Sequence, residues 1–171
     1  AFEDYRVDKV VEMHQRLLGL AYEIREEKPG FGVVVTMLDN IGTPELRRSQ
    51  GIDIERILEL HERYPFTLVV EDPMARWSEH PDRYRGIARM YRERLGDDFA
   101  LDINILSFRS EEKPTMFPTL VQSGLEAFAL SRISSEEVTR TLMYAESSIN
   151  AQDLPLMSFA STGQARILTT N

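Results

Sequence analysis

The stretch FTLVVEDP at residues 66–73 decides the fold, because it joins a short apolar run to two acidic residues and a proline. A continuous apolar run bounded by turn residues is typical of a strand buried on both faces, as in a parallel sheet. Three more runs fit the same pattern: GVVVTML at 32–38, FALDINIL at 99–106 and RTLMYA at 140–145. We therefore expect four buried, parallel strands.

Helical periodicity fills the intervals between these strands. Apolar residues recur at spacings of three and four over residues 4–28, 53–63 and 81–95. Asp53 is a typical N-cap residue for the second of these helices. The segment 118–131, which begins with a proline, predicts a fourth helix. Such regular alternation of strands and helices indicates parallel strands joined by right-handed crossovers.

Two α/β architectures fit this order, a doubly wound open sheet and a (β/α)8 barrel. No glycine-rich phosphate loop follows any strand, which disfavours a nucleotide-binding open sheet. Polar residues follow the strands instead, as in barrel enzymes, whose chemistry lies at the C-terminal ends of the strands.

Length argues against a complete barrel, which needs about 250 residues. The 171 residues hold at most six strands, because residues 153–161 fit either a short helix or a strand and residues 165–170 look extended. We therefore expect residues 1–171 to form a single parallel (β/α) barrel-type domain, an incomplete or truncated TIM barrel that is part of a longer chain. A compact four- or five-stranded α/β sandwich is the alternative.

The composition and charge of the chain argue against several classes of function. A net charge of -8 and a pI near 5.0 disfavour nucleic acid as a partner. No apolar run reaches the roughly 20 residues of a membrane span. The absence of cysteine excludes thiolate catalysis, and the three histidines lack metal-site spacing, so we expect neither metal nor cofactor. The cellular location stays open, with a secreted or periplasmic protein compatible with these features, and so does the oligomeric state.

Glu71 and Glu146 are the central candidates for catalysis. Each directly follows a predicted strand, so both are expected at the same end of the sheet. A pair of carboxyl groups across a barrel mouth is what glycoside hydrolysis needs: one donates a proton to the leaving oxygen, and the other attacks the anomeric carbon or activates water. A strand-end glutamate also fits a structural role, such as capping the next helix.

Other residues near the strand ends are candidate substrate contacts. Asp102 and Asn104 lie two apart on one strand and therefore share a face. A tryptophan beyond Glu71 could stack on a sugar ring, although a packed indole fits equally. The predicted substrate-binding residues are Asp39, Asn40, Asp72, Trp77, Asp102, Asn104 and Tyr144.

Residues 64–73, YPFTLVVEDP, resemble the strand of the enolase superfamily that ends in Glu-Asp-Pro. That resemblance implies a magnesium ligand on this strand and a further acidic ligand on a neighbouring one, for which Asp102 is the candidate. It also implies a lysine base on a later strand, but no lysine follows Lys113.

A broader resemblance covers residues 31–160. The succession VVVTMLDN, FTLVVEDP, FALDINIL, FPTLVQSGLEAF, RTLMYAESSI and DLPLMSFAS resembles uncharacterised bacterial proteins grouped with glycosidase-type TIM barrels. It is similar to the retaining glycoside hydrolases, in which two strand-end glutamates are the acid/base and the nucleophile. The resemblance implies Glu71 as the acid and Glu146 as the nucleophile, with a bacterial polysaccharide or oligosaccharide as substrate.

Three functional hypotheses follow from the sequence. The first is a glycoside hydrolase-like protein that acts on a carbohydrate. The second is a non-catalytic sugar-binding or scaffold domain on a barrel fold. The third is a magnesium-dependent lyase of the enolase type.

Overall fold

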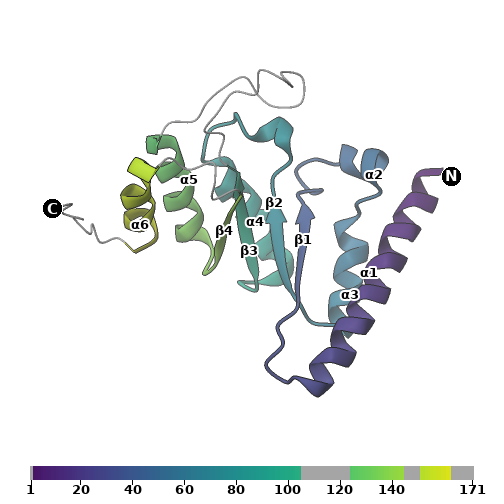
Figure 1. The fold of residues 1–171 in the computed structure, drawn as a ribbon. Helices are drawn as coiled ribbons and strands as arrows, with labels where there is room; N and C mark the ends of the chain where they lie inside the picture. Colours follow the sequence, from purple (N-terminus) through teal and green to yellow (C-terminus); the bar gives the residue numbers. More distant parts are fainter. Residues whose placement is uncertain (1, 105–123, 145–150, 163–171) are drawn as a thin grey trace. The chain divides into compact units, whose positions relative to one another are not determined.

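The computed structural model describes residues 2–104, 124–144 and 151–162. Helices and strands alternate in it as the sequence predicts (Figure 1). Their order and bounds are α1 (Phe2–Glu27), β1 (Val34–Leu38), α2 (Glu45–Gln50), α3 (Ile54–Arg63), β2 (Thr67–Glu71), the 3-10 turn η1 (Met74–Arg76), α4 (Arg83–Leu95), β3 (Phe99–Asn104), α5 (Gly124–Glu137), β4 (Thr141–Tyr144), the 3-10 turn η3 (Ala151–Asp153) and α6 (Leu154–Thr162).

The four strands form one parallel sheet in the order β1-β2-β3-β4. The register between β3 and β4 pairs Leu101 with Thr141 and Asn104 with Tyr144. Each crossover therefore moves the chain to the next strand, and the order does not reverse anywhere among the four described strands. The predicted parallel α/β fold is confirmed at this level.

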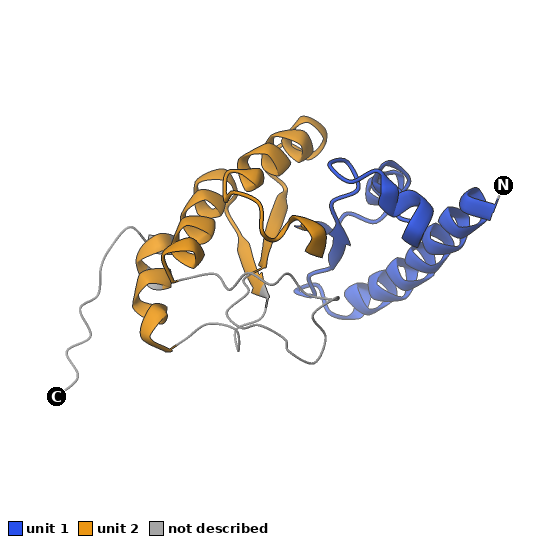
Figure 2. Ribbon diagram, turned by 90° about the horizontal axis from the view of Figure 1, so that it is seen from above, with its two compact units in different colours: residues 1–70 blue, residues 71–171 orange. Residues whose placement is uncertain are grey.

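The chain divides into two compact units, residues 1–70 and 71–171 (Figure 2). In the first unit, α1 packs against α2 and α3 and buries Val7, Val11 and Leu18. Asp53 caps α3 as predicted, since its side chain accepts a hydrogen bond from the Arg56 backbone N–H at 3.3 Å. The sequence pattern did not indicate the six-residue helix α2, which is too short to show a periodicity.

The prediction that residues 32–38 are buried on both faces is wrong. Val34 is 51% exposed, Thr36 is exposed, and only Met37 is buried within β1. Because β1 stands at the end of the described strand order, it has one strand neighbour where β2 and β3 have two. The local sequence shows how apolar a strand is. The position of the strand in the sheet determines how many of its side chains are buried by neighbours.

In the second unit, α4 packs against β3 and α5. It buries Tyr84, Ile87, Ala88 and Tyr91, which follow the spacing of three and four residues that predicts a helix over 81–95. The segment 153–161, which the sequence left open between a helix and a strand, is helical: Asp153 ends η3 and the rest lies in α6. Phe159 of α6 stacks on Phe128 of α5 at 5.8 Å between ring centroids.

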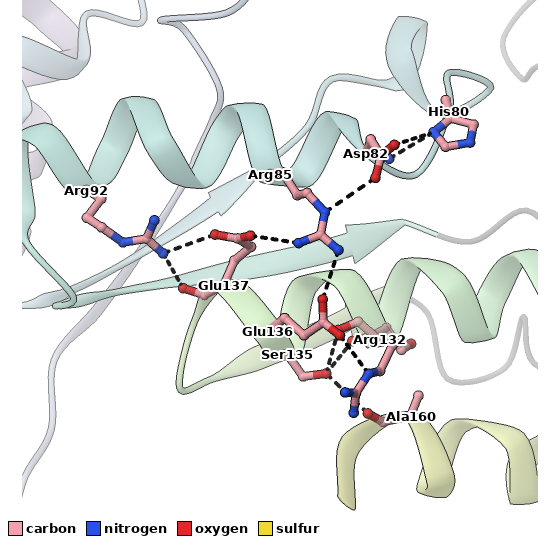
Figure 3. Close-up of polar contacts among 10 residues, drawn as sticks. His80, Asp82, Arg85, Arg92, Arg132, Ser135, Glu136, Glu137 and Ala160 are labelled. Carbon is pink, nitrogen blue, oxygen red and sulfur yellow. Dashed lines mark hydrogen bonds and ion pairs between the residues drawn. The ribbon is translucent and has the colours of Figure 1, made fainter. Parts of the chain in front are cut away.

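An ion-pair network ties α4 to α5 on the surface of this unit (Figure 3). Arg85 contacts Glu136 at 2.8 Å and Glu137 at 3.1 Å. Arg92 reaches both the carboxylate of Glu137, at 3.2 Å, and its carbonyl oxygen, at 2.6 Å. These partners are partly solvent exposed, so the network adds little to stability compared with the apolar contacts beneath it.

Candidate functional site

Asp72 organises a buried polar cluster just beyond the C-terminal end of β2. Its carboxylate is fully buried and accepts hydrogen bonds from three side chains. Arg83 Nε donates to it at 2.8 Å, the Tyr84 hydroxyl at 2.7 Å and Asn104 Nδ2 at 3.0 Å. A charge this deep is stable only when it is paired and hydrogen-bonded, which these donors achieve together.

The three donors come from two elements, so the cluster ties the end of β2 to both α4 and β3. Arg83 and Tyr84 start α4, whereas Asn104 ends β3. The Tyr84 hydroxyl also accepts the backbone N–H of Asn104 at 3.1 Å. Burial, followed by the charge of Asp72, raises the pKa of Tyr84 well above its ordinary value, so this hydroxyl keeps its proton and remains a donor.

Glu71 lies beside this cluster as the last residue of β2, and its side chain is half-buried. Burial raises the pKa of its carboxyl, and the charges of Asp102 and Asp72 raise it further, while a hydrogen bond from Asn104 partly offsets these effects. Burial and the charge of Asp72 also raise the pKa of Asp102. Glu71 therefore holds a proton more readily than an ordinary glutamate, as a general acid must.

Two oxygen atoms at this end of β3 are buried without a hydrogen-bond partner in the described part of the chain. They are Oδ1 of Asp102 and Oδ1 of Asn104. An unsatisfied buried acceptor costs free energy, so such atoms are uncommon; a catalytic role is one of the explanations for them. Oγ1 of Thr43 and Oγ of Ser134 are also unsatisfied in the described residues, but the two acceptors on β3 lie beside Glu71. Both atoms can accept hydrogen bonds from hydroxyl groups.

The predicted shared face of Asp102 and Asn104 agrees with this arrangement, since both residues act on the Glu71 carboxyl. Asp72, also predicted as a substrate contact, is instead occupied by protein donors on its carboxylate. Its place in the structure is that of a support for its neighbours.

The predicted pair Asp39 and Asn40 lies in the first unit, after β1. Oδ1 of Asp39 accepts the backbone N–H groups of Ile41 and Gly42 at 3.1 and 3.0 Å, which closes the turn after the strand. Oδ1 of Asn40 accepts the N–H of Ile54 at 3.1 Å at the start of α3. Both side chains therefore shape the backbone that follows β1.

Trp77 is 8% exposed, and its indole Nε1 donates to the carbonyl oxygen of Asp72 at 2.9 Å. The ring is a packed part of the cluster, so it offers no open face for a sugar to stack on. Tyr144 ends β4, opposite Asn104 in the register, but its side chain lies outside the described residues. Glu146 also lies outside them.

Sequence reasoning missed Arg83 and Tyr84 as members of the site. Tyr84 was assigned to the apolar stripe of α4, which is correct for its ring but not for its hydroxyl. Arg83 is 2% exposed at its side chain, although a charged residue at the start of a helix is expected in solvent. The sequence offers one signal: Arg83 directly precedes Tyr84, a residue of the buried face of α4. An arginine that is buried at such a position needs a carboxylate partner.

No group of three or more histidine, aspartate or glutamate side chains in the described ranges is arranged to hold a metal ion. Among the helices of these ranges, none is both long and apolar enough to cross a membrane. The polar side chains of the described site are the carboxyl groups of Glu71, Asp72 and Asp102, the amide of Asn104, the hydroxyl of Tyr84 and the guanidinium of Arg83.

We compared the chain with protein families, curated proteins and solved structures. No family model, curated protein or solved structure matches it. The function is therefore argued from the residues of the chain itself.

Proposed function

We propose that this protein is a glycoside hydrolase-like enzyme of the (β/α) barrel type, with Glu71 as the proton donor. One observation carries the proposal: a half-buried carboxyl group with a raised pKa ends β2 beside two unsatisfied acceptors. Cleavage of a glycosidic bond requires a carboxylic acid that is still protonated when substrate binds, and hydroxyl-rich substrates supply donors for buried acceptors.

The strand order supports the barrel part of the proposal. Consecutive strands are neighbours in the order β1-β2-β3-β4, as they are around a (β/α) barrel. Doubly wound sheets instead reverse their strand order at a switch point, where they bind nucleotides.

In the proposed reaction, Glu71 protonates the leaving oxygen as the glycosidic bond breaks, and Glu146 is the nucleophile on the opposite side of the sugar. Asp102 and Asn104 accept hydrogen bonds from substrate hydroxyl groups through their unsatisfied Oδ1 atoms, which are buried in the absence of substrate. Asp72 contacts no substrate; it holds Asn104 and Tyr84 in place through the hydrogen bonds described above.

The two alternatives have weaker support in the described residues. A magnesium-dependent lyase would use Glu71 and Asp102 as metal ligands, but no group of three or more histidine, aspartate or glutamate side chains in the described ranges is arranged to hold a metal ion. A non-catalytic sugar-binding domain would use the same two unsatisfied acceptors, Oδ1 of Asp102 and Oδ1 of Asn104, without Glu71 as an acid. It is the outcome that remains if the protein binds a saccharide and cleaves none.

The test uses a panel of bacterial polysaccharides and of aryl glycosides with good leaving groups. On an unactivated glycoside, Glu71→Gln should lower kcat/KM by about 10² to 10⁴-fold, the usual contribution of general acid catalysis. On an aryl glycoside the first step should survive, because its leaving group needs little protonation. Glu146→Gln should abolish that step on both substrates, since no covalent intermediate can form.

Asp102→Asn is the companion variant, because it removes a neighbouring charge and keeps the carboxyl group of Glu71. It should weaken substrate binding and, since the charge of Asp102 raises the pKa of Glu71, shift the loss of activity at rising pH to lower pH. Hydrolysis by the intact protein that is unaffected by Glu71→Gln would refute the assignment of Glu71. No hydrolysis of any substrate in the panel would refute the enzyme proposal.

A further inference from the structure

A second, separate feature is the outer face of α1, which is apolar although α1 already buries its opposite face. Met13, Leu17, Leu20 and Ile24 are 50%, 57%, 57% and 44% exposed. Their spacing of four, three and four residues places them in one line along the helix. We call these four residues the α1 seam. An ordinary surface helix carries polar residues there, so the seam calls for a partner.

The spacing of the seam is that of a coiled coil. Alternating steps of three and four residues match the a and d positions of a heptad, with Leu17 and Ile24 at a and Met13 and Leu20 at d. Hollows lie along the seam, one lined in part by Arg16, Leu20 and Glu23 and another in part by Lys9, Met13 and Leu17. Side chains of a facing helix need such hollows to pack between the seam residues.

We propose that the α1 seam binds the α1 seam of a second copy of this chain, with the two helices antiparallel. A two-fold axis between Leu17 and Leu20 then brings Leu17 opposite Leu20 of the second copy, and Met13 opposite its Ile24. Each of the four seam residues then contacts an apolar residue of the second copy. The result is a two-fold symmetric dimer in which both copies contribute the same surface, so no further copy can be added through it.

The charges beside the seam favour the antiparallel pairing. The residues that precede the a positions on this side are Arg16 and Glu23, both exposed. In the antiparallel dimer, Arg16 lies beside Glu23 of the second copy, and symmetry repeats this pair. A parallel dimer would set Arg16 beside Ala21, and the basic partner of Glu23 would be Lys28, which lies beyond the end of α1.

Neighbouring apolar residues enlarge the surface that the dimer covers. Phe31 and Val34 are exposed beside the helix, and Leu17 also lines a hollow together with Ala21 and Val34. A seam of four side chains with a few apolar neighbours belongs with the smaller protein interfaces, which bury less than about 1,200 Å². The dimer is therefore expected to be in equilibrium with the monomer.

Sedimentation velocity on the full chain tests this inference, over about 1 µM to 1 mM so that a weak interface is covered. The expected mass rises with concentration from 19.7 kDa toward twice that value. Leu20→Glu places a carboxylate in two symmetric layers and should raise the dissociation constant roughly 100-fold or more. Leu125→Glu is the control, since Leu125 is a 72% exposed leucine of α5, and it should leave the equilibrium unchanged.

Charge reversal tests the orientation. Arg16→Glu and Glu23→Arg should each weaken the dimer by placing like charges together, and the double variant should restore it. Circular dichroism confirms for every variant that α1 is still helical. A chain that stays monomeric over the whole range, or a dimer that Leu20→Glu leaves intact, overturns the proposal. A double variant that is weaker than both single variants overturns the antiparallel pairing.

Discussion

Arg83 and Arg85 provide a direct test of the buried cluster, because they are two residues apart on α4 and both pair with carboxylates. The Arg83 side chain is 2% exposed and contacts a fully buried Asp72, whereas the Arg85 side chain is 45% exposed. We therefore expect Arg83→Met to destabilise the protein strongly and Arg85→Met to have a small effect. Methionine keeps much of the apolar length of the side chain in both variants.

The magnitude follows from what each substitution leaves behind. Without Arg83, the carboxylate of Asp72 keeps two neutral donors but loses its only cation among the described contacts. Breaking a buried ion pair in this way costs about 3–5 kcal/mol, a large share of the roughly 5–15 kcal/mol by which a domain is stable. Without Arg85, the Glu136 side chain, which is 37% exposed, is solvated by water, and Glu137 keeps its ion pair with Arg92 (Figure 3).

Urea unfolding followed by the fluorescence of Trp77 is the assay. This residue is the only tryptophan, and it is hydrogen-bonded to Asp72, so its signal reports on the cluster itself. Adding Asp72→Asn to Arg83→Met removes the unpaired charge and should recover part of the lost stability. Equal losses in Arg83→Met and Arg85→Met, or a double variant less stable than Arg83→Met, would refute this account of the cluster.

Two further predictions concern stability. Because the pKa of Glu71 is raised above its ordinary 4.5, the folded state binds more protons than the unfolded state, and stability falls as pH rises from about 4.5 through the folded pKa. Denaturation midpoints across pH should therefore show Glu71→Gln more stable than the parent at neutral pH, with the difference vanishing below about pH 4; a constant difference would contradict it. Gly51 has a φ of +74° and the added Cβ would lie 3.0 Å from the Arg6 backbone, so Gly51→Ala should cost more than about 1 kcal/mol. Gly86, which lies within α4 and has open space around it, is the control. Gly86→Ala should raise the melting temperature, since alanine is favoured over glycine by about 0.5–1 kcal/mol in a helix. A stabilising Gly51→Ala or a destabilising Gly86→Ala would contradict this argument.

The sequence by itself determined where most of the helices and strands lie, although not α2 or α6. Apolar periodicity located α1, α3 and α4, and apolar runs bounded by turn residues located the four strands, because these signals are local. Alternation of the elements implied parallel strands, and the two-residue period placed Asp102 and Asn104 on one face. The strand-end position of Glu71 followed from the same reasoning.

Only the tertiary structure decided which of these residues are buried and what they contact. Glu71 and Asp72 are adjacent acids in the sequence, but Asp72 became the buried centre because Arg83, Tyr84 and Asn104 converge on it. A local pattern cannot supply those partners, since two of them lie on the next helix and one on the next strand. The same limit explains Trp77, whose indole is covered by packing, and β1, whose exposure depends on its place in the sheet. Periodicity gives the direction of a side chain, and the assembled neighbours determine its burial, its hydrogen bonds and its pKa.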